Sequence, residues 1–210
     1  HKKVLAFLAD AYPHLEDASL SPMQEVSYQA RDQLKIPAYL TLPGNQTKNL
    51  PLVVMPHGGP WARDDWGFNN YVQFFASRGY AVFQPQFRGS TGFGNELHEA
   101  GYKQWGHAIQ DDITDGVNWL VNQGIADPQR ICIIGANFGG YAAAMGLIRT
   151  PDLYQCAISI NGVMDMNRFY HDLAYYHIVN RDITNSKWGI EKASPYHLAA
   201  DIKRPFLIIA

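Results

Sequence analysis

Residues 130–141 constrain the fold of this chain more than any other stretch. Residues 131–134 form a short, uninterrupted apolar run, which is typical of a strand buried on both faces. Residues 141–148 are mostly small and apolar, as expected for a closely packed helix. Three glycines lie between the two segments: Gly135, Gly139 and Gly140. Because glycine lets two backbones approach closely, the stretch predicts a strand, a sharp turn and a helix packed against that strand.

This arrangement is the frame of a nucleophile elbow, G-x-S-x-G, in which the central side chain sits on a strained turn and faces the substrate. Here the central residue is Asn137, where a hydrolase carries serine. An amide is a poor nucleophile, and a neighbouring histidine does not activate it. Three interpretations follow: a substitution that silenced an enzyme, a natural inactive relative, or a plain strand-to-helix connection.

The composition restricts the function classes. The chain has 210 residues, enough for one sizeable core, and 47% of them are hydrophobic. The formal net charge is -2, so no broad attraction to nucleic acid or to an anionic membrane is expected. No apolar run approaches the length of a membrane span.

The two cysteines, Cys132 and Cys156, lie in apolar runs that we interpret as neighbouring strands. We expect two buried thiols that act as small hydrophobic side chains. The alternative is a disulfide, which suits a pleated core less well. Two cysteines do not reveal the compartment, so cytoplasmic and periplasmic or secreted locations both stay open.

Period-two alternation in residues 25–31 and 36–42 predicts two strands, and their short connection predicts an antiparallel hairpin. From residue 51 onward, strands and helices alternate. The predicted strands are 51–56, 80–84, 131–134, 156–160 and 205–210. The predicted helices are 69–78, 95–102, 108–122, 141–148 and one that starts at Ser194. Residues 165–179 are predicted to be partly helical. This order predicts an α/β fold with a mostly parallel sheet, antiparallel leading strands and helices on both faces. Because the chain stops on an apolar strand, we expect a C-terminally truncated domain.

The chain resembles the catalytic domain of the prolyl oligopeptidase family, closest to its acylaminoacyl-peptidase and dipeptidyl-peptidase-like branch. The matching segments, in order, are residues 28–43, 57–64 (HGGPWARD), 87–94 (FRGSTGFG), 104–106, 111–112, 127–130 and 135–140 (GANFGG). The resemblance implies an α/β-hydrolase fold and serine peptidase chemistry on peptides. It also implies an upstream β-propeller domain, with residues 1–25 as a lead-in segment and residues 26–210 as the hydrolase domain.

The sequence departs from the family pattern in three places. Asn137 replaces the nucleophilic serine, and Gln33 stands where the family usually has glycine. The family's catalytic acid and histidine would both fall after residue 210. Of the residues after Asn137, three histidines and five aspartates could replace them, but we expect cap, surface or pocket-rim roles: His171, His177, His197, Asp152, Asp165, Asp172, Asp182 and Asp201.

The oxyanion hole is expected to survive the loss of the serine. The backbone N–H of Phe138, directly after the nucleophile position, should point at the developing charge. The resemblance implies a second backbone donor, the N–H of Gly59 in the His57 loop. His57 itself is expected to shape that loop. Together with Trp61 and Tyr170 it is also a candidate to line the substrate cleft, although aromatic residues are as often core.

Other polar residues are assigned mainly structural roles. Arg88 and Asp64 lie in loops that need pinning, and Trp66 and Phe93 are further pocket or core candidates. His171 and His177 are six residues apart and so lie on different helix faces, which argues against a metal site. No cofactor is expected.

We therefore predict a serine-type peptidase of the prolyl oligopeptidase family, acting on peptides, that is inactive because its nucleophile position holds Asn137. The alternative is a natural pseudoenzyme that binds peptides or a partner protein through the former cleft. A third option, an esterase or lipase of the same fold, is weakened by the matches over residues 28–43 and 57–64.

Overall fold

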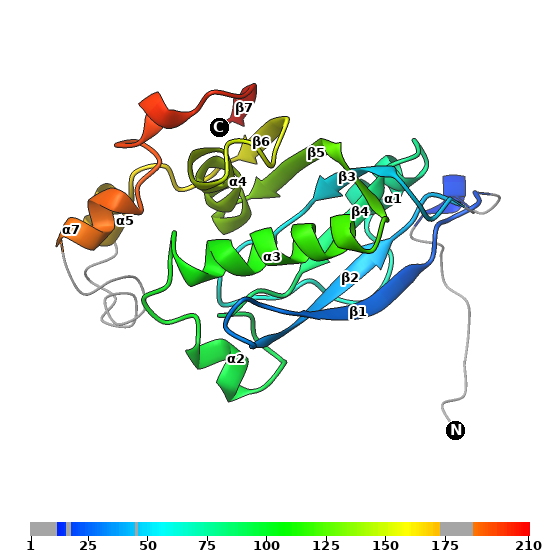
Figure 1. Ribbon diagram of the computed structural model, residues 1–210, viewed down its shortest axis with the longest axis horizontal. Coiled ribbons are helices and arrows are strands. Elements are labelled where there is room, and N and C mark those ends of the chain that lie inside the picture. The colour runs from blue at the N-terminus through cyan, green and yellow to red at the C-terminus, as the bar shows by residue number, and fades with distance from the viewer. Residues whose placement is uncertain (1–11, 16–17, 45, 173–186) are drawn as a thin grey trace.

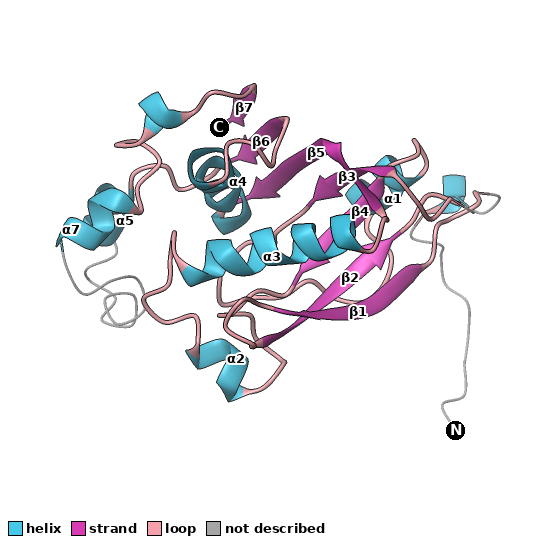
Figure 2. Cartoon of the chain, viewed as in Figure 1, coloured by secondary structure: helices cyan, strands magenta, loops and turns pink. Residues whose placement is uncertain are grey.

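The computed structural model describes residues 12–15, 18–44, 46–172 and 187–210. Its described strands form one seven-stranded sheet in the order β1-β2-β4-β3-β5-β6-β7 (Figures 1 and 2). The strands are β1 (Met23–Gln29), β2 (Lys35–Thr41), β3 (Leu50–Val54), β4 (Ala81–Pro85), β5 (Ala126–Ala136), β6 (Cys156–Ile160) and β7 (Phe206–Ile209). β1, β2 and β4 pair antiparallel, whereas β4, β3, β5, β6 and β7 run parallel. The predicted α/β sheet with an antiparallel leading edge is confirmed.

Helices cover both faces of this sheet. They are α1 (Asn70–Ala76), α2 (Asn95–Glu99), α3 (Ala108–Asn122), α4 (Phe138–Arg149), α5 (Met166–Asp172) and α7 (Lys187–Lys192), with short 3-10 turns at Pro13–Leu15 and Ala199–Asp201. Figure 1 shows α3 lying across the sheet, and α4 packs beside it on β5 and β6. α1 packs on β4 from the opposite face, where Val72 and Ala76 are buried.

The apolar stripe of α3 explains how this helix lies on the sheet. Ile109, Ile113, Val117 and Leu120 recur at three- and four-residue spacing, and all are buried. Gly116 lies on the same side, where a Cβ atom would meet the ring of Phe83 in β4. The helix therefore comes close to the strand at the one residue that has no side chain.

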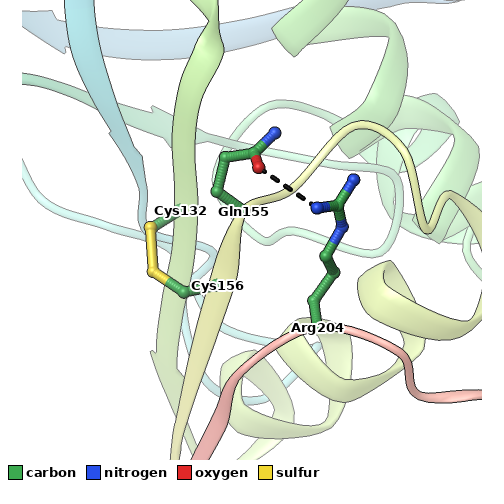
Figure 3. The surroundings of a disulfide bond; sticks show 4 residues. All are labelled: Cys132, Gln155, Cys156 and Arg204. Carbon is green, nitrogen blue, oxygen red and sulfur yellow. Dashed lines mark hydrogen bonds between the residues drawn. A yellow bond between two sulfur atoms is a disulfide. The ribbon is translucent and has the colours of Figure 1, made fainter.

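The expectation of two buried thiols is wrong, because Cys132 and Cys156 form a disulfide. Parallel pairing of β5 and β6 places the two residues directly opposite each other, with their Cα atoms 4.8 Å apart. That separation lies within the range a disulfide can bridge. Figure 3 shows the bond beside Arg204, which donates to the side-chain oxygen of Gln155 (3.4 Å) and so ties the segment before β7 to β6.

One other local prediction is corrected. No helix starts at Ser194: the described chain forms successive turns there, with His197 N–H donating to Ser194 O and Leu198 N–H to Pro195 O. The Ser194 hydroxyl is instead held between Met166 N–H and Met164 O, next to α5. In the aromatic-rich stretch, residues 173–179 lie outside the described residues. No helix in the described part of the chain is long and apolar enough to cross a bilayer.

Candidate functional site

Asn137 lies at a sharp elbow between β5 and α4. Its φ of 55° and ψ of -120° place a non-glycine residue in a sparsely populated backbone region. Such strain persists only where the surroundings impose it, and it is frequent at active sites. A Cβ atom on Gly139 would overlap the carbonyl oxygen of Pro56, and one on Gly135 would overlap the backbone of Gly139. The elbow therefore depends on these two glycines, as the G-x-x-x-G spacing predicts.

The side chain of Asn137 lies between two backbone donors. Its Oδ1 atom accepts the N–H of Phe138 at 2.7 Å and the N–H of Gly59 at 3.4 Å. Because both partners are N–H groups, the amide oxygen and not the amide nitrogen must face them. The structure thus brings together the three residues that the sequence singled out for the nucleophile position and the oxyanion hole. What the sequence did not indicate is that the Asn137 side chain itself accepts from both donors.

His57 is held inside the loop that carries Gly59. Its Nδ1–H group donates to Gly58 O at 2.7 Å, its Nε2 atom lies 2.8 Å from Ser90 Oγ, and its ring stacks on Phe87 at 4.3 Å. Only 8% of the residue is exposed, and burial lowers the pKa of His57 to about 4. A neutral ring fixed on both sides is suited to shaping the loop. Ser90, which the sequence analysis missed, is its partner.

Arg88 fixes the loop that carries Phe87 and Ser90, two of the residues that contact the His57 ring. Its guanidinium donates to both carboxylate oxygens of Asp112 (2.8 and 2.7 Å) and to both of Asp32 (2.8 and 3.0 Å). The backbone N–H of Arg88 also donates to Asp112, at 2.9 Å. Arg88 therefore joins α3 and the β1–β2 turn to the loop that supports His57. These contacts support the structural role expected for Arg88.

The backbone of Asp64 is held by two hydrogen bonds with the side chain of Gln86. Its N–H donates to Gln86 Oε1 at 3.1 Å, and its carbonyl accepts from Gln86 Nε2 at 2.9 Å. Burial raises the pKa of its carboxyl group to about 6, a change that the side-chain hydrogen bond with Gln84 partly offsets. Asp64 also helps to line a mainly apolar cavity of about 350 Å³ beside the elbow. Its other lining residues include His57, Gly58, Ile134, Ala136 and Ile160.

An aromatic cluster lies on the helix side of the elbow. Trp105 is buried and centres the group: its ring is 4.6 Å from Phe138, 5.5 Å from Tyr141, 5.8 Å from Phe169 and 5.9 Å from Trp61. Of the predicted cleft residues, Trp61 joins this cluster. The side chain of Tyr170 lies outside the described residues.

Two further aromatic candidates lie elsewhere. Trp66 is 55% exposed and packs edge-on against Tyr39. Phe93 lines a separate depression with residues of β1 and β2. Sequence alone could not separate these residues from Trp61, because the separation depends on which loops meet at the elbow.

The described residues provide no catalytic partner for Asn137. Among them, no histidine or carboxylate side chain forms a hydrogen bond with Asn137, and His197 stacks on its neighbour Tyr196. His177 and Asp182 lie outside the described residues. No group of three or more described His, Cys, Asp or Glu residues is arranged to hold a metal ion. Two backbone N–H groups therefore face the amide oxygen of Asn137, and no base among the described residues is hydrogen-bonded to this side chain.

Comparisons with known proteins place this geometry in context. A model of the prolyl oligopeptidase family matches residues 66–210. Dipeptidyl aminopeptidase BIII of Pseudoxanthomonas mexicana is 39% identical over 97% of this chain and 32% of its own length. Dipeptidyl peptidase family member 6 of Caenorhabditis elegans is 30% identical over the whole chain and 33% of its own length. The chain thus spans about a third of the length of these curated relatives.

Solved structures of a hydrolase and a peptidase have the same fold as this chain. A puromycin hydrolase superposes with a TM-score of 0.83 and 27% identity, covering 90% of this chain and 30% of that one. The acylaminoacyl peptidase of Pyrococcus horikoshii superposes with a TM-score of 0.84 over 95% of this chain and 33% of that one. Its 24% identity supports the shared α/β-hydrolase fold alone.

Proposed function

The chain belongs to the prolyl oligopeptidase family of serine peptidases, and from this premise we propose that it is the hydrolase part of a peptide-hydrolysing enzyme in which asparagine replaces the nucleophilic serine. The proposed substrates are oligopeptides. In this proposal Asn137 marks the nucleophile position, and the N–H groups of Phe138 and Gly59 form the oxyanion hole.

One observation carries this proposal: Asn137 occupies the strained elbow, and the two backbone donors converge on its side chain. A serine at this position would place its hydroxyl where the donors could stabilise the oxyanion formed by its attack. Each such donor typically contributes about 3 kcal/mol to the stabilisation of a transition state. An amide at the same position does not supply a nucleophile, so we expect no turnover by the serine mechanism.

The wider organisation is also proposed. Residues 26–210 form the hydrolase domain, and residues 1–25 are the lead-in from an upstream β-propeller domain. The described end of this lead-in is anchored on α1, because Ser21 N–H donates to the side-chain oxygen of Gln73, and Gln73 Nε2 donates to Ser21 O. Such an anchor would fix the direction from which an upstream domain enters.

The proposal is tested by fluorophosphonate labelling of the protein at its natural full length, unchanged and as the Asn137→Ser variant. We expect labelling of the variant at residue 137 and none of the unchanged protein. Labelling at residue 137 requires a working oxyanion hole, base and acid together. Peptide hydrolysis by the unchanged protein, with contaminating peptidases excluded, would contradict the proposed inactivity.

A binding role is the second candidate. The aromatic cluster of Trp61, Trp105 and Phe138 remains assembled beside the elbow although the serine is absent. A folded Asn137→Ser protein that is not labelled would favour this pseudoenzyme, in which the cleft binds peptides or a partner protein without cleaving them.

A further inference from the structure

The side chain of Asn137 has the chemical form of a substrate. It is a primary amide, and its carbonyl oxygen is the atom on which the N–H groups of Phe138 and Gly59 converge. Its Cγ atom therefore corresponds to the carbonyl carbon of a bound peptide, and its Nδ2 atom corresponds to the leaving nitrogen. Asn137 is also exposed to solvent.

We propose that Asn137 is a self-hydrolysis site, where water converts the side-chain amide to aspartate with the help of its own oxyanion hole. This proposal rests on the donor role proposed above for Phe138 and Gly59. The two donors polarise the carbonyl and stabilise the negative charge that forms on Oδ1 when the carbonyl is attacked.

The reaction balances with water as the only co-reactant. The water oxygen forms a bond to Cγ, and the π electrons of the carbonyl move to Oδ1. When the carbonyl re-forms, the Cγ–Nδ2 bond breaks, and a proton from the attacking water is transferred to nitrogen. Ammonia leaves, and the new carboxylic acid ionises. Since no described histidine or carboxylate forms a hydrogen bond with Asn137, solvent supplies the base, and the rate should rise with pH.

The geometry favours direct attack by water over the common ring-closing route to deamidation. In ring closure, the backbone nitrogen of the following residue attacks Cγ. Here that nitrogen belongs to Phe138, which donates its N–H to Oδ1 and begins α4. The Phe138 ring is buried in the aromatic cluster, which fixes the backbone further. Direct hydrolysis yields aspartate alone, whereas hydrolysis of the ring yields isoaspartate as well.

Asn49 is a matched control within the same chain. It too has a positive φ (50°), is exposed and precedes a large apolar residue, Leu50. In the described part of the chain, its side-chain oxygen accepts no backbone N–H. If a left-handed backbone alone caused deamidation, both residues would react at similar rates.

The test incubates the full-length protein at mildly alkaline pH in water enriched in the heavy oxygen isotope and follows the peptides by mass spectrometry. We expect Asn137 to become aspartate at least tenfold faster than Asn49, with heavy oxygen incorporated and no isoaspartate at residue 137. Equal rates at the two residues, or isoaspartate at residue 137, would overturn the proposal.

A glycine variant tests the donor directly. In Gly59→Ala, the new Cβ would lie 2.7 Å from the Trp61 nitrogen at a φ of 124°, so the loop must shift and withdraw the Gly59 N–H. We expect hydrolysis at Asn137 to slow about 100-fold, the effect of losing one oxyanion donor. Gly67→Ala is the control, because Gly67 also has a positive φ (138°) but faces open space. Equal rates in the two variants would contradict the proposal.

This readout is independent of peptidase activity. If Asn137 stays intact while the Asn137→Ser protein is labelled, only self-hydrolysis is refuted. If neither reaction occurs in a folded protein, self-hydrolysis is refuted and the pseudoenzyme candidate is favoured over the peptidase.

Discussion

Arg88 and Asp112 form a two-point ion pair inside the protein, with Nε–Oδ2 and Nη2–Oδ1 distances of 2.8 and 2.7 Å. The Arg88 side chain is 8% exposed and that of Asp112 is fully buried. Burial alone would lower the pKa of Arg88, but its hydrogen bonds to Asp112 and Asp32 outweigh burial and raise it. The pair is therefore a charged, hydrogen-bonded anchor for the loop under His57.

Breaking this pair should be strongly destabilising. We expect Arg88→Ala to lower the free energy of unfolding by about 3–5 kcal/mol, because Asp112 would remain as an uncompensated buried charge. Urea unfolding followed by circular dichroism measures the change. Arg31→Ala is the control, because Arg31 pairs with Asp111 and Asp115 of the same helix, but its side chain is 53% exposed. The free energy of unfolding of Arg31→Ala should fall by less than about 1 kcal/mol. Equal losses in the two variants would contradict the anchoring role of Arg88.

Removing the disulfide should destabilise the fold through the unfolded state. Cys132 and Cys156 are 24 residues apart, and closing a loop of this size stabilises a protein by about 3 kcal/mol in the chain-entropy model. We expect the Cys132→Ala/Cys156→Ala protein to melt lower than the oxidised parent and to be insensitive to reductant. Alkylation with mass analysis checks the pairing: two free thiols in the unreduced parent would contradict it.

A methyl group at Gly139 should force α4 away from the segment that follows β3. Its Cβ would overlap the Pro56 carbonyl oxygen, and backbone cannot move as freely as a side chain. We expect Gly139→Ala to cost about 1–3 kcal/mol of stability, the range for overpacked sites. Gly146→Ala in the same helix should cost less, because its nearest contact is the edge of the Tyr154 ring, at 3.0 Å. Thermal melts of both variants decide between these outcomes.

His57 should stay neutral well below the usual histidine range. Its ordinary pKa is 6.5, and burial lowers the folded-state pKa to about 4. Between these values, the unfolded chain binds a proton at this ring and the folded chain does not. Protonation therefore favours the unfolded state, and His57 reduces the free energy of unfolding by up to about 3 kcal/mol as the pH falls from 6.5 to 4.

The His57→Gln variant isolates this contribution. NMR titration of the ring, assigned by comparison with this variant, should show no protonation of His57 between pH 6.5 and 5. The variant should also lose less stability than the parent on acidification over that window. A His57 signal that titrates near its ordinary pKa would show that the ring is solvated and not fixed against Phe87 and Ser90.

Local patterns predicted those elements whose residues repeat regularly. The apolar stripe of residues 108–122 predicted α3 with its observed bounds, and the alternation before residue 43 predicted the β1–β2 hairpin. Gln33, at the turn of this hairpin, has a φ of 71°, which explains why related sequences would favour glycine there. These features depend on neighbours in sequence and so are visible without a structure.

Features that depend on distant segments were not predictable in the same way. Whether Cys132 and Cys156 meet depends on the register of β5 against β6, which no local pattern encodes. Ser90 forms a hydrogen bond with His57 only because the fold brings their two loops together. The hydrogen bond from Gly59 to Asn137 likewise joins residues that are 78 positions apart in the sequence. The motifs predicted which residues gather at the elbow, but not the hydrogen bonds that they form there.

The outermost position of β7 among the described strands has a consequence for handling the 210-residue chain. Among the described strands, β7 ends the sheet on its side, and Leu207, Ile208 and Ile209 are 54%, 55% and 47% exposed. Because neighbouring side chains in a strand point to opposite faces, apolar surface is open both above and below this edge. Bare edges of this kind recruit strands from other molecules. Solutions of the 210-residue chain should therefore self-associate as concentration rises, and a lysine placed on β7 would be the simplest way to keep them monodisperse.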